Sequence, residues 1–202
     1  MKGVGVPQIS LTDFVDVVSK AGRPKATKVR QIKERPDYEP ALDFYKALRD
    51  HIVDCHKKSK GKGALGDVLK KLSDPKKISN YPGLIKCYEK WWGRKDIVWF
   101  VPPKSVYSFG GFDINLNPEL GLRINGVDHV VKLYLKSDPL ASQMAEIVID
   151  LLESELRSNV DPGCNFCVLD VRKTKLHSEG PHVVKSIGLI KAELAYMASI
   201  WG

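Results

Sequence analysis

The sequence predicts an α+β fold, in which a helical N-terminal region packs on a mixed, mostly antiparallel β-sheet flanked by helices. Three observations predict it. The apolar residues before Asp96 recur at helical spacing, the period changes to two after Asp96, and a later strand stands between two helical segments. The back half therefore has the order helix, three or four antiparallel strands, helix, strand, helix (αβββαβα). We expect residues 1–80 to form a basic helical region and residues 81–202 to form the α+β core, the two packing as one compact unit.

Capping residues mark the expected helices of the N-terminal region. Ser10 or Thr12 can cap the first helix, and Gly22 can stop it. Pro82 suits the first position of the last helix, and Gly93 suits its end. Between them, apolar side chains recur at helical spacing, which predicts a buried stripe. The expected helices cover residues 11–20, 39–55, 65–72 and 82–95.

The back half contains a strong hairpin signal at Asn125-Gly126. A type I′ turn needs two residues that tolerate positive φ, and this pair stands between two segments of alternating polarity. The strand that follows the crossover helix is expected to lie in the sheet beside an earlier strand. The expected strands cover residues 97–101, 106–110, 112–117, 119–124, 128–135 and 165–176, and the expected helices cover residues 137–156 and 181–201.

Positive charge is concentrated in the front of the chain. Residues 1–95 hold 22 Lys and Arg against 11 Asp and Glu, a net of +11, whereas residues 96–202 hold 10 against 13, a net of −3. This asymmetry favours a polyanionic partner, either nucleic acid or an acidic protein, although a solvated lysine-rich face has the same composition. No apolar run approaches the roughly 20 residues of a membrane helix, and the first residues hold no apolar block of signal-peptide length. We therefore expect a cytoplasmic protein that does not enter a membrane.

Candidate phosphate-binding residues lie in two cationic stretches, residues 23–35 and residues 56–63. HKKSKGKG, residues 56–63, interrupts the helical pattern and is expected to be a mobile loop. Trp91 and Trp92 stand among lysines and arginines, and aromatic stacking flanked by cations is how single-stranded nucleic acid is held without sequence reading. The alternative is that at least one of these indoles packs in the core. The expected nucleic-acid-binding residues are Arg23, Lys25, Lys28, Arg30, Lys57, Lys58, Lys60, Lys62 and Trp92.

The strand over residues 128–135 has one polar face and one apolar face. Lys132, Tyr134 and Lys136 share one side, because successive side chains of a strand point to opposite faces. Two lysines and a tyrosine on one face could form a ladder that contacts phosphates. An ordinary half-exposed antiparallel strand has the same pattern, so both interpretations stay open.

The order of elements over roughly residues 82–172 resembles the core of the PD-(D/E)XK nuclease superfamily. In that superfamily an acidic residue on the second strand, often after proline, converges with an acid-x-lysine motif on the third. Pro118-Glu119 matches the first part, and Lys136 stands where the lysine would stand. The resemblance implies a Mg²⁺ ion held by carboxylates, with the lysine beside the water that attacks a phosphodiester.

The second acid of that motif is missing. Tyr134 stands two residues before Lys136, and Val130 stands two residues before Lys132 if that lysine is taken instead. The candidate replacements are Asp113 and Glu89, so the resemblance implies Glu119, Asp113, Lys136 and Lys132 as catalytic residues, with Glu119 and Asp113 as ligands of Mg²⁺.

Cys164 and Cys167 have the spacing of half a zinc site, with His177 or His182 within reach in the sequence. A second pair of comparable spacing is missing, so buried reduced thiols are the better interpretation. The segments LTDFVD, NPELGLRING, VVKLYLK and VLDVRKTKL also resemble a bacterial protein family of similar length, which brings no activity to transfer.

Three functions are compatible with these observations. The first is a nucleic-acid-binding protein with a degenerate nuclease-like core, such as a bacterial or phage defence factor or a DNA-processing factor. The second is a non-catalytic interaction module, for example an immunity-type accessory subunit with an acidic partner. The third is an active Mg²⁺-dependent nuclease.

Overall fold

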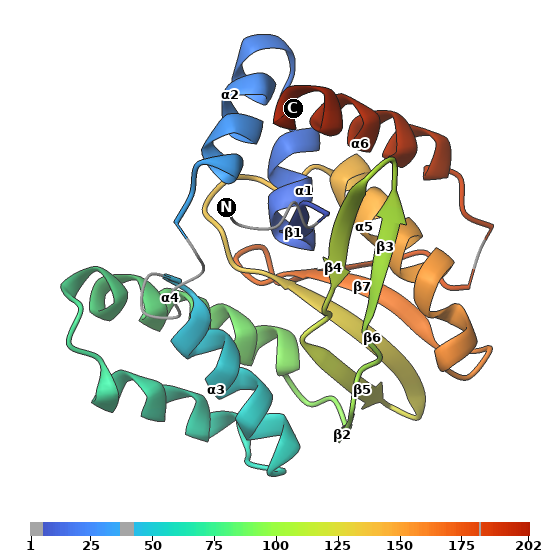
Figure 1. The fold of residues 1–202 in the computed structure, drawn as a ribbon. Helices are drawn as coiled ribbons and strands as arrows, with labels where there is room; N and C mark the ends of the chain where they lie inside the picture. The colour runs from blue at the N-terminus through green and yellow to red at the C-terminus, as the bar shows by residue number, and fades with distance from the viewer. Residues whose placement is uncertain (1–5, 37–42, 182) are drawn as a thin grey trace.

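The fold is α+β, and the computed structural model describes residues 6–36, 43–181 and 183–202 (Figure 1). A larger sheet has the strand order β2-β5-β6-β7-β8, and a smaller sheet has the order β1-β4-β3. The strands are β1 Gln8–Ser10, β2 Ile97–Phe100, β3 Ser105–Phe109, β4 Phe112–Leu116, β5 Leu120–Ile124, β6 Val127–Tyr134, β7 Asn165–Asp170 and β8 Lys175–Ser178. The helices are α1 Leu11–Val18, α2 Gly22–Lys33, α3 Lys46–Lys57, α4 Pro75–Trp92, α5 Ser142–Leu156 and α6 Ile187–Trp201, with the 3-10 helices η1 Lys62–Lys71 and η2 Arg157–Asn159. Within the described residues, no helix is both long enough and apolar enough to cross a membrane.

The larger sheet contains the hairpin that its turn sequence predicts. Asn125 and Gly126 adopt φ values of 49° and 88°, the two left-handed residues of a type I′ turn. After α5, β7 returns parallel to β6 and next to it. Both expectations are confirmed.

The expected strand over residues 165–176 is two strands. The chain turns after β7, where Thr174 adopts a φ of 53°, and the Asp170 carboxylate accepts a hydrogen bond from the Lys173 N–H at 3.1 Å. β8 then pairs antiparallel to β7. A side chain that bonds the backbone of its own turn explains the break.

The strands β3 and β4, which were expected in the same sheet as β2, β5 and β6, belong to the smaller sheet instead. Pro102 and Pro103 stand between β2 and β3, and since proline has no N–H with which to continue a ladder, the chain leaves the larger sheet there. β3 and β4 form a hairpin across Gly110 and Gly111, whose φ values are 60° and 75°. β1, which comes from the N-terminal region, pairs in parallel with β4.

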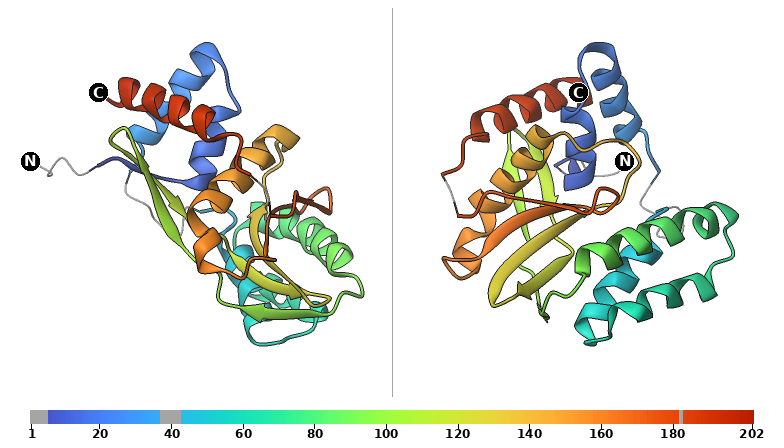
Figure 2. Two further views of the ribbon diagram at one scale, coloured as in Figure 1. Left: turned by 90° about the vertical axis from the view of Figure 1, so that its right-hand side faces the viewer. Right: turned by 180° about the vertical axis from the view of Figure 1, so that it is seen from behind.

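Two apolar cores lie on opposite faces of the larger sheet. Alternate residues of β6 divide between them, since Val131 and Leu133 pack in one core and Val130 packs in the other. The first core is enclosed by α3, η1 and α4, and we call residues 46–95, which contain these three helices, the helical lobe. The second core is enclosed by α1, α2, α5, α6 and the smaller sheet. The larger sheet is therefore covered on both sides, as the views in Figure 2 show.

The N-terminal region is divided between these cores. α1 and α2 pack in the second core, whereas α3 and η1 belong to the helical lobe, and the boundary expected at residue 80 falls inside α4. Asp74 caps α4 by accepting a hydrogen bond from the Lys76 N–H at 2.8 Å, and Pro75 occupies its first turn, so Pro82 lies in the helix interior rather than at its start. The expected helices over residues 39–55 and 181–201 lie partly outside the described residues. Within the described residues, the first of these segments contains α3 and the second contains α6.

Arg172 joins the helical lobe to the larger sheet. From the turn after β7, its guanidinium donates to the carbonyl oxygens of Leu135 and Lys136 at 3.1 and 3.0 Å. It also donates to the side chain of Asn80 on α4 at 3.0 Å. Together with the apolar core, these bonds fix the position of the lobe on the sheet.

Candidate functional site

Glu119 and Lys132 form an ion pair between β5 and β6. The register places Leu120 opposite Val131, so Glu119, which directly precedes β5, lies next to Lys132. The Lys132 ammonium is 2.5 Å from Glu119 Oε1, and the Leu133 N–H donates to Glu119 Oε2 at 2.8 Å. The two side chains are only 14% and 10% exposed. Both carboxylate oxygens of Glu119 thus have partners inside the protein.

Lys136 and Asp113 take other partners. Lys136 reaches Asp16 on α1 at 2.5 Å, and Lys28 on α2 lies 3.3 Å from the same carboxylate oxygen. Asp113 accepts a hydrogen bond from the Ser108 hydroxyl at 2.6 Å, in the smaller sheet. The four residues that the nuclease resemblance implied therefore belong to three separate contacts.

The polar face of β6 is not a solvent face. Lys132, Tyr134 and Lys136 do lie on one side of the strand, but Tyr134 packs against the second core and both lysines are largely covered. A period of two fixes which residues share a face, but it does not say what covers that face. Here Glu119, directly before β5, pairs with Lys132, and Asp16, on α1, pairs with Lys136.

The arrangement does not fit a Mg²⁺ site at Glu119 and Asp113. Mg²⁺ is held by carboxylates and water in near-octahedral geometry, yet each of these side chains already bonds a donor of its own. Within the described ranges, no group of three or more His, Cys, Asp or Glu is placed to hold a metal ion. We derive no hydrolytic step from these residues.

Cys164 and Cys167 are buried thiols. Burial raises the pKa of Cys164 to about 11 and that of Cys167 to about 12, so both stay protonated near neutral pH. His177 lies on β8, and His182 lies outside the described residues.

A cationic segment at the end of α3 folds back onto the helix. Ser59 adopts a φ of 51°, its N–H donates to the His56 carbonyl at 3.0 Å, and the Lys60 N–H donates to the Cys55 carbonyl at 2.8 Å. This bonding pattern is the Schellman motif, which satisfies the last carbonyls of a helix. The segment expected as a mobile loop over residues 56–63 is thus divided between α3, this tight turn and η1.

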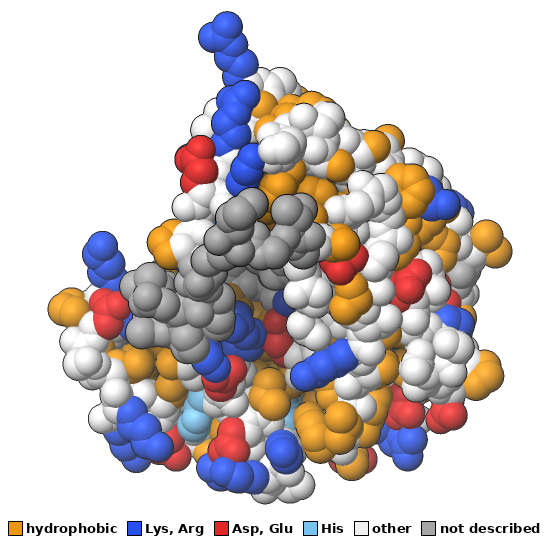
Figure 3. All heavy atoms as spheres, viewed as in Figure 1, with side chains coloured by type: hydrophobic (Ala, Val, Ile, Leu, Met, Phe, Trp, Pro, Cys, Tyr) orange, Lys and Arg blue, Asp and Glu red, His pale blue; other side chains and the backbone are white. Residues whose placement is uncertain are grey.

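The turn places lysines around a hollow between α3 and η1. Lys58 and Lys60 share the carboxylate of Asp54 at 2.6 and 3.2 Å, and Lys70 pairs with Asp67 at 2.7 Å. The hydrogen bond from Lys58 lowers the pKa of Asp54, and that from Lys70 lowers the pKa of Asp67. The hollow measures about 410 Å³, and its lining residues are His51, Asp54, Lys58, Lys60, Asp67, Lys70 and Lys71. Figure 3 shows basic and acidic side chains close together along this lower edge of the molecule.

Lys57, Lys62 and Trp92 lie outside this hollow. The Lys57 ammonium sits 5.8 Å from the centre of the Trp99 ring, and Lys62 donates to the Gly93 carbonyl at 2.8 Å. Trp92 stacks on His56, with 4.2 Å between ring centres. One face of the indole that was expected to stack on bases is therefore covered by the protein itself.

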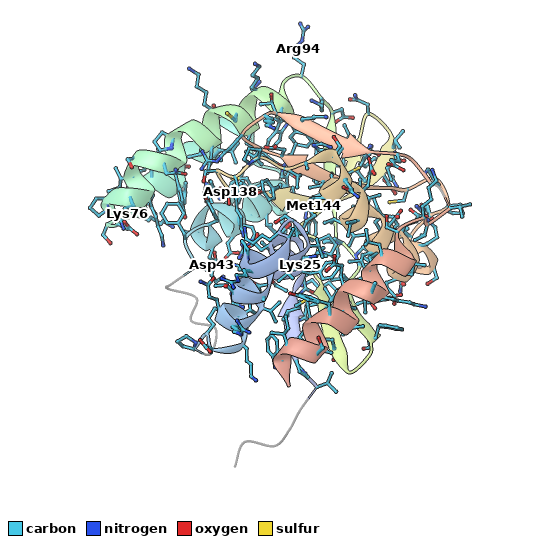
Figure 4. The ribbon with its side chains drawn as sticks, turned by 90° about the horizontal axis from the view of Figure 1, so that it is seen from above. Lys25, Asp43, Lys76, Arg94, Asp138 and Met144 are labelled. Atoms are coloured by element: carbon cyan, nitrogen blue, oxygen red, sulfur yellow. The ribbon has the colours of Figure 1, made fainter. Side chains whose placement is uncertain are left out.

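Helix α2, which carries the other predicted cations, lies at the top of the molecule in Figure 1, whereas α3 lies at the bottom, and Figure 2 shows the same separation. Lys25 pairs with Glu193 of α6 at 2.7 Å, and Figure 4 shows it far from Arg94, which projects from the end of the helical lobe. Lys28 pairs with Asp16, whereas Arg23 and Arg30 are exposed. The eight predicted cations thus lie in two separate places, one group on α2 and the other around the end of α3 and the start of η1.

The sequence did not indicate Lys70 and Lys71 as binding residues. Their position beside Lys58 and Lys60 depends on the packing of η1 against α3, which no local pattern encodes. The sequence feature that could have indicated them is the net charge of residues 46–95, the helical lobe. These residues include 14 Lys and Arg against 5 Asp and Glu, a net of +9, whereas the rest of the chain has 18 against 19, a net of −1. The chain matches no protein-family model and none of the curated proteins with which it was compared.

Proposed function

We propose that the protein binds nucleic acid through the helical lobe. One observation carries this proposal: the lobe has a net charge of +9 while the rest of the chain is close to neutral, and four of its lysines surround one hollow. Lysines that neutralise phosphates release condensed counterions, which supplies most of the free energy of binding that does not depend on sequence.

The ion pairs in the hollow are compatible with this role. Asp54 pairs with both Lys58 and Lys60, and Asp67 pairs with Lys70, so the carboxylates position these lysines around the hollow. The lysine side chains of these pairs are between 41% and 79% exposed, and exposed ion pairs contribute little to stability because water and salt screen them. A phosphate can therefore replace either carboxylate at little cost.

The test is the salt dependence of binding, measured by fluorescence anisotropy of labelled oligonucleotides. Four phosphates neutralised by the hollow give a slope of log K against log salt of about −3 to −4, so affinity should fall about 100-fold between roughly 50 and 200 mM salt. An affinity that is the same at both salt concentrations contradicts the proposal.

Two double variants with the same change in charge locate the binding surface. Lys58→Ala with Lys60→Ala removes two cations from the hollow, and Arg23→Ala with Arg30→Ala removes two exposed cations from α2. The first variant should reduce the steepness of the salt slope by about 2, and the second should change it much less. The opposite order would move the binding surface to α2.

An acidic protein is the other polyanion that the lobe could bind. The ultraviolet absorbance spectrum of protein purified at low salt distinguishes the two, because copurifying nucleic acid absorbs at shorter wavelength than protein. A clean protein spectrum together with no oligonucleotide binding would favour the acidic partner.

A further inference from the structure

Within the described residues, the aromatic side chains are largely covered. Apart from Tyr38, which lies outside the described residues, every Phe, Tyr and Trp is buried or half-buried. The exposed large apolar side chains in the described ranges are Val, Ile and Leu. A protein that holds unpaired bases needs the opposite arrangement, with aromatic faces open to solvent.

The rings of the helical lobe and its neighbouring strand are covered by specific contacts. Trp91 is 5% exposed and lies beneath Lys95, whose ammonium is 5.1 Å from the ring centre. Trp92 stacks on His56 with an angle of 17° between the rings, and the Trp99 ring faces the ammonium of Lys57. The hollow itself is lined by charged side chains and His51. The lobe therefore presents charge without a platform for bases.

A double helix is the form of nucleic acid that matches such a surface. Its bases are paired inside, and its two strands present about one negative charge per 1.7 Å of axis, whereas a flexible single strand releases fewer counterions per contact. A binding surface with an excess of cations and no open aromatic face gains more from the denser charge, and it loses nothing when the bases are hidden.

We infer that the helical lobe binds the sugar-phosphate backbone of double-helical nucleic acid, without reading or stacking on bases. This inference rests on the nucleic-acid binding proposed above and specifies its ligand. It assigns Lys58, Lys60, Lys70 and Lys71 to phosphate contacts and gives Trp92 a structural role in place of a stacking role.

The experiment compares a labelled duplex of about 20 base pairs with each of its separated strands, as DNA and as RNA, at one low salt concentration. We expect at least one duplex to bind about tenfold more tightly than either of its strands. Three of the four tryptophans lie in the lobe or beside it, so tryptophan emission reports base stacking directly and needs no variant. Emission should stay unchanged when single strands are added.

Two outcomes overturn the inference in different ways. Single strands that bind as tightly as the duplex, with quenching of tryptophan emission, would show base stacking and leave the nucleic-acid proposal standing. Failure of every duplex and strand to bind would remove the nucleic-acid proposal itself. Tighter binding of the DNA duplex or of the RNA duplex identifies which nucleic acid the protein binds, and either result supports the inference.

Discussion

Replacing Lys132 by methionine should destabilise the protein substantially. Lys132 and Glu119 are 2.5 Å apart and only 14% and 10% exposed, and the Leu133 N–H is the other donor to Glu119. Methionine keeps the apolar stem but removes the charge, so the Glu119 carboxylate stays covered with one partner fewer. Loss of one partner from a fully buried pair costs about 3–5 kcal/mol. Because a little exposure remains here, we expect a loss of about 2–3 kcal/mol, or about 4–12 °C in Tm for a chain of this length.

The assay is urea unfolding of the wild type, Lys132→Met, Glu119→Gln and the double variant. The double variant removes both charges, so its loss should be smaller than the sum of the single losses by about 1 kcal/mol or more. Lys136→Met is the matched control, because Lys136 is 29% exposed and its partner Asp16 keeps Lys28. Wild-type stability in Lys132→Met would refute the reasoning, since it would mean that the pair lies on a solvent-exposed face.

Three further predictions concern the helical lobe. Ser59→Gly should raise the free energy of unfolding by about 0.5–1 kcal/mol, because Ser59 has a φ of 51° that glycine adopts without strain. Thermal unfolding of this variant checks the prediction, with Ser59→Val, which should be less stable than the wild type, as the comparison. Burial lowers the pKa of His56 from 6.5 to about 4. Between these two pH values the unfolded chain binds a proton at His56 that the folded protein does not bind. The free energy of unfolding should therefore be highest above about pH 6.5 and should fall towards pH 4 by up to about 1.4 kcal/mol per pH unit. Urea midpoints at several pH values should depend less on pH in His56→Gln, and an equally steep profile in that variant would contradict the assignment. Asp54→Asn frees Lys58 and Lys60 and should tighten nucleic-acid binding several-fold in the anisotropy assay, whereas Asp50→Asn, which changes the charge equally on the same helix but outside the hollow, should have a smaller effect.

Local signals predicted the local structure. The Asn125-Gly126 turn forms because the backbone of those two residues alone decides it, and Ser10 caps α1 by accepting a hydrogen bond from the Asp13 N–H at 3.0 Å. The start of α4 was placed too late because Pro82 suits a first turn as well as Pro75 does, and only the Asp74 cap before Pro75 decides between them.

The candidate site depended on contacts between distant segments, which sequence patterns do not contain. The alternation in β6 put Lys132 and Lys136 on one face, but Asp16, which covers Lys136, is 120 residues away in the chain. The lysine hollow likewise requires η1 to pack against α3. Composition indicated the cationic part of the chain correctly, yet it grouped α2 with residues that lie across the molecule from it.

The uneven placement of charge makes the whole molecule an electric dipole. The lobe carries a net of +9 at one end, and the other residues sum to −1. In the field of a polyanion such a molecule turns with its lobe forward before any atoms touch, which increases the fraction of productive collisions. Added salt should then slow capture more than it hastens release, because the orienting torque acts over a range that counterions shorten.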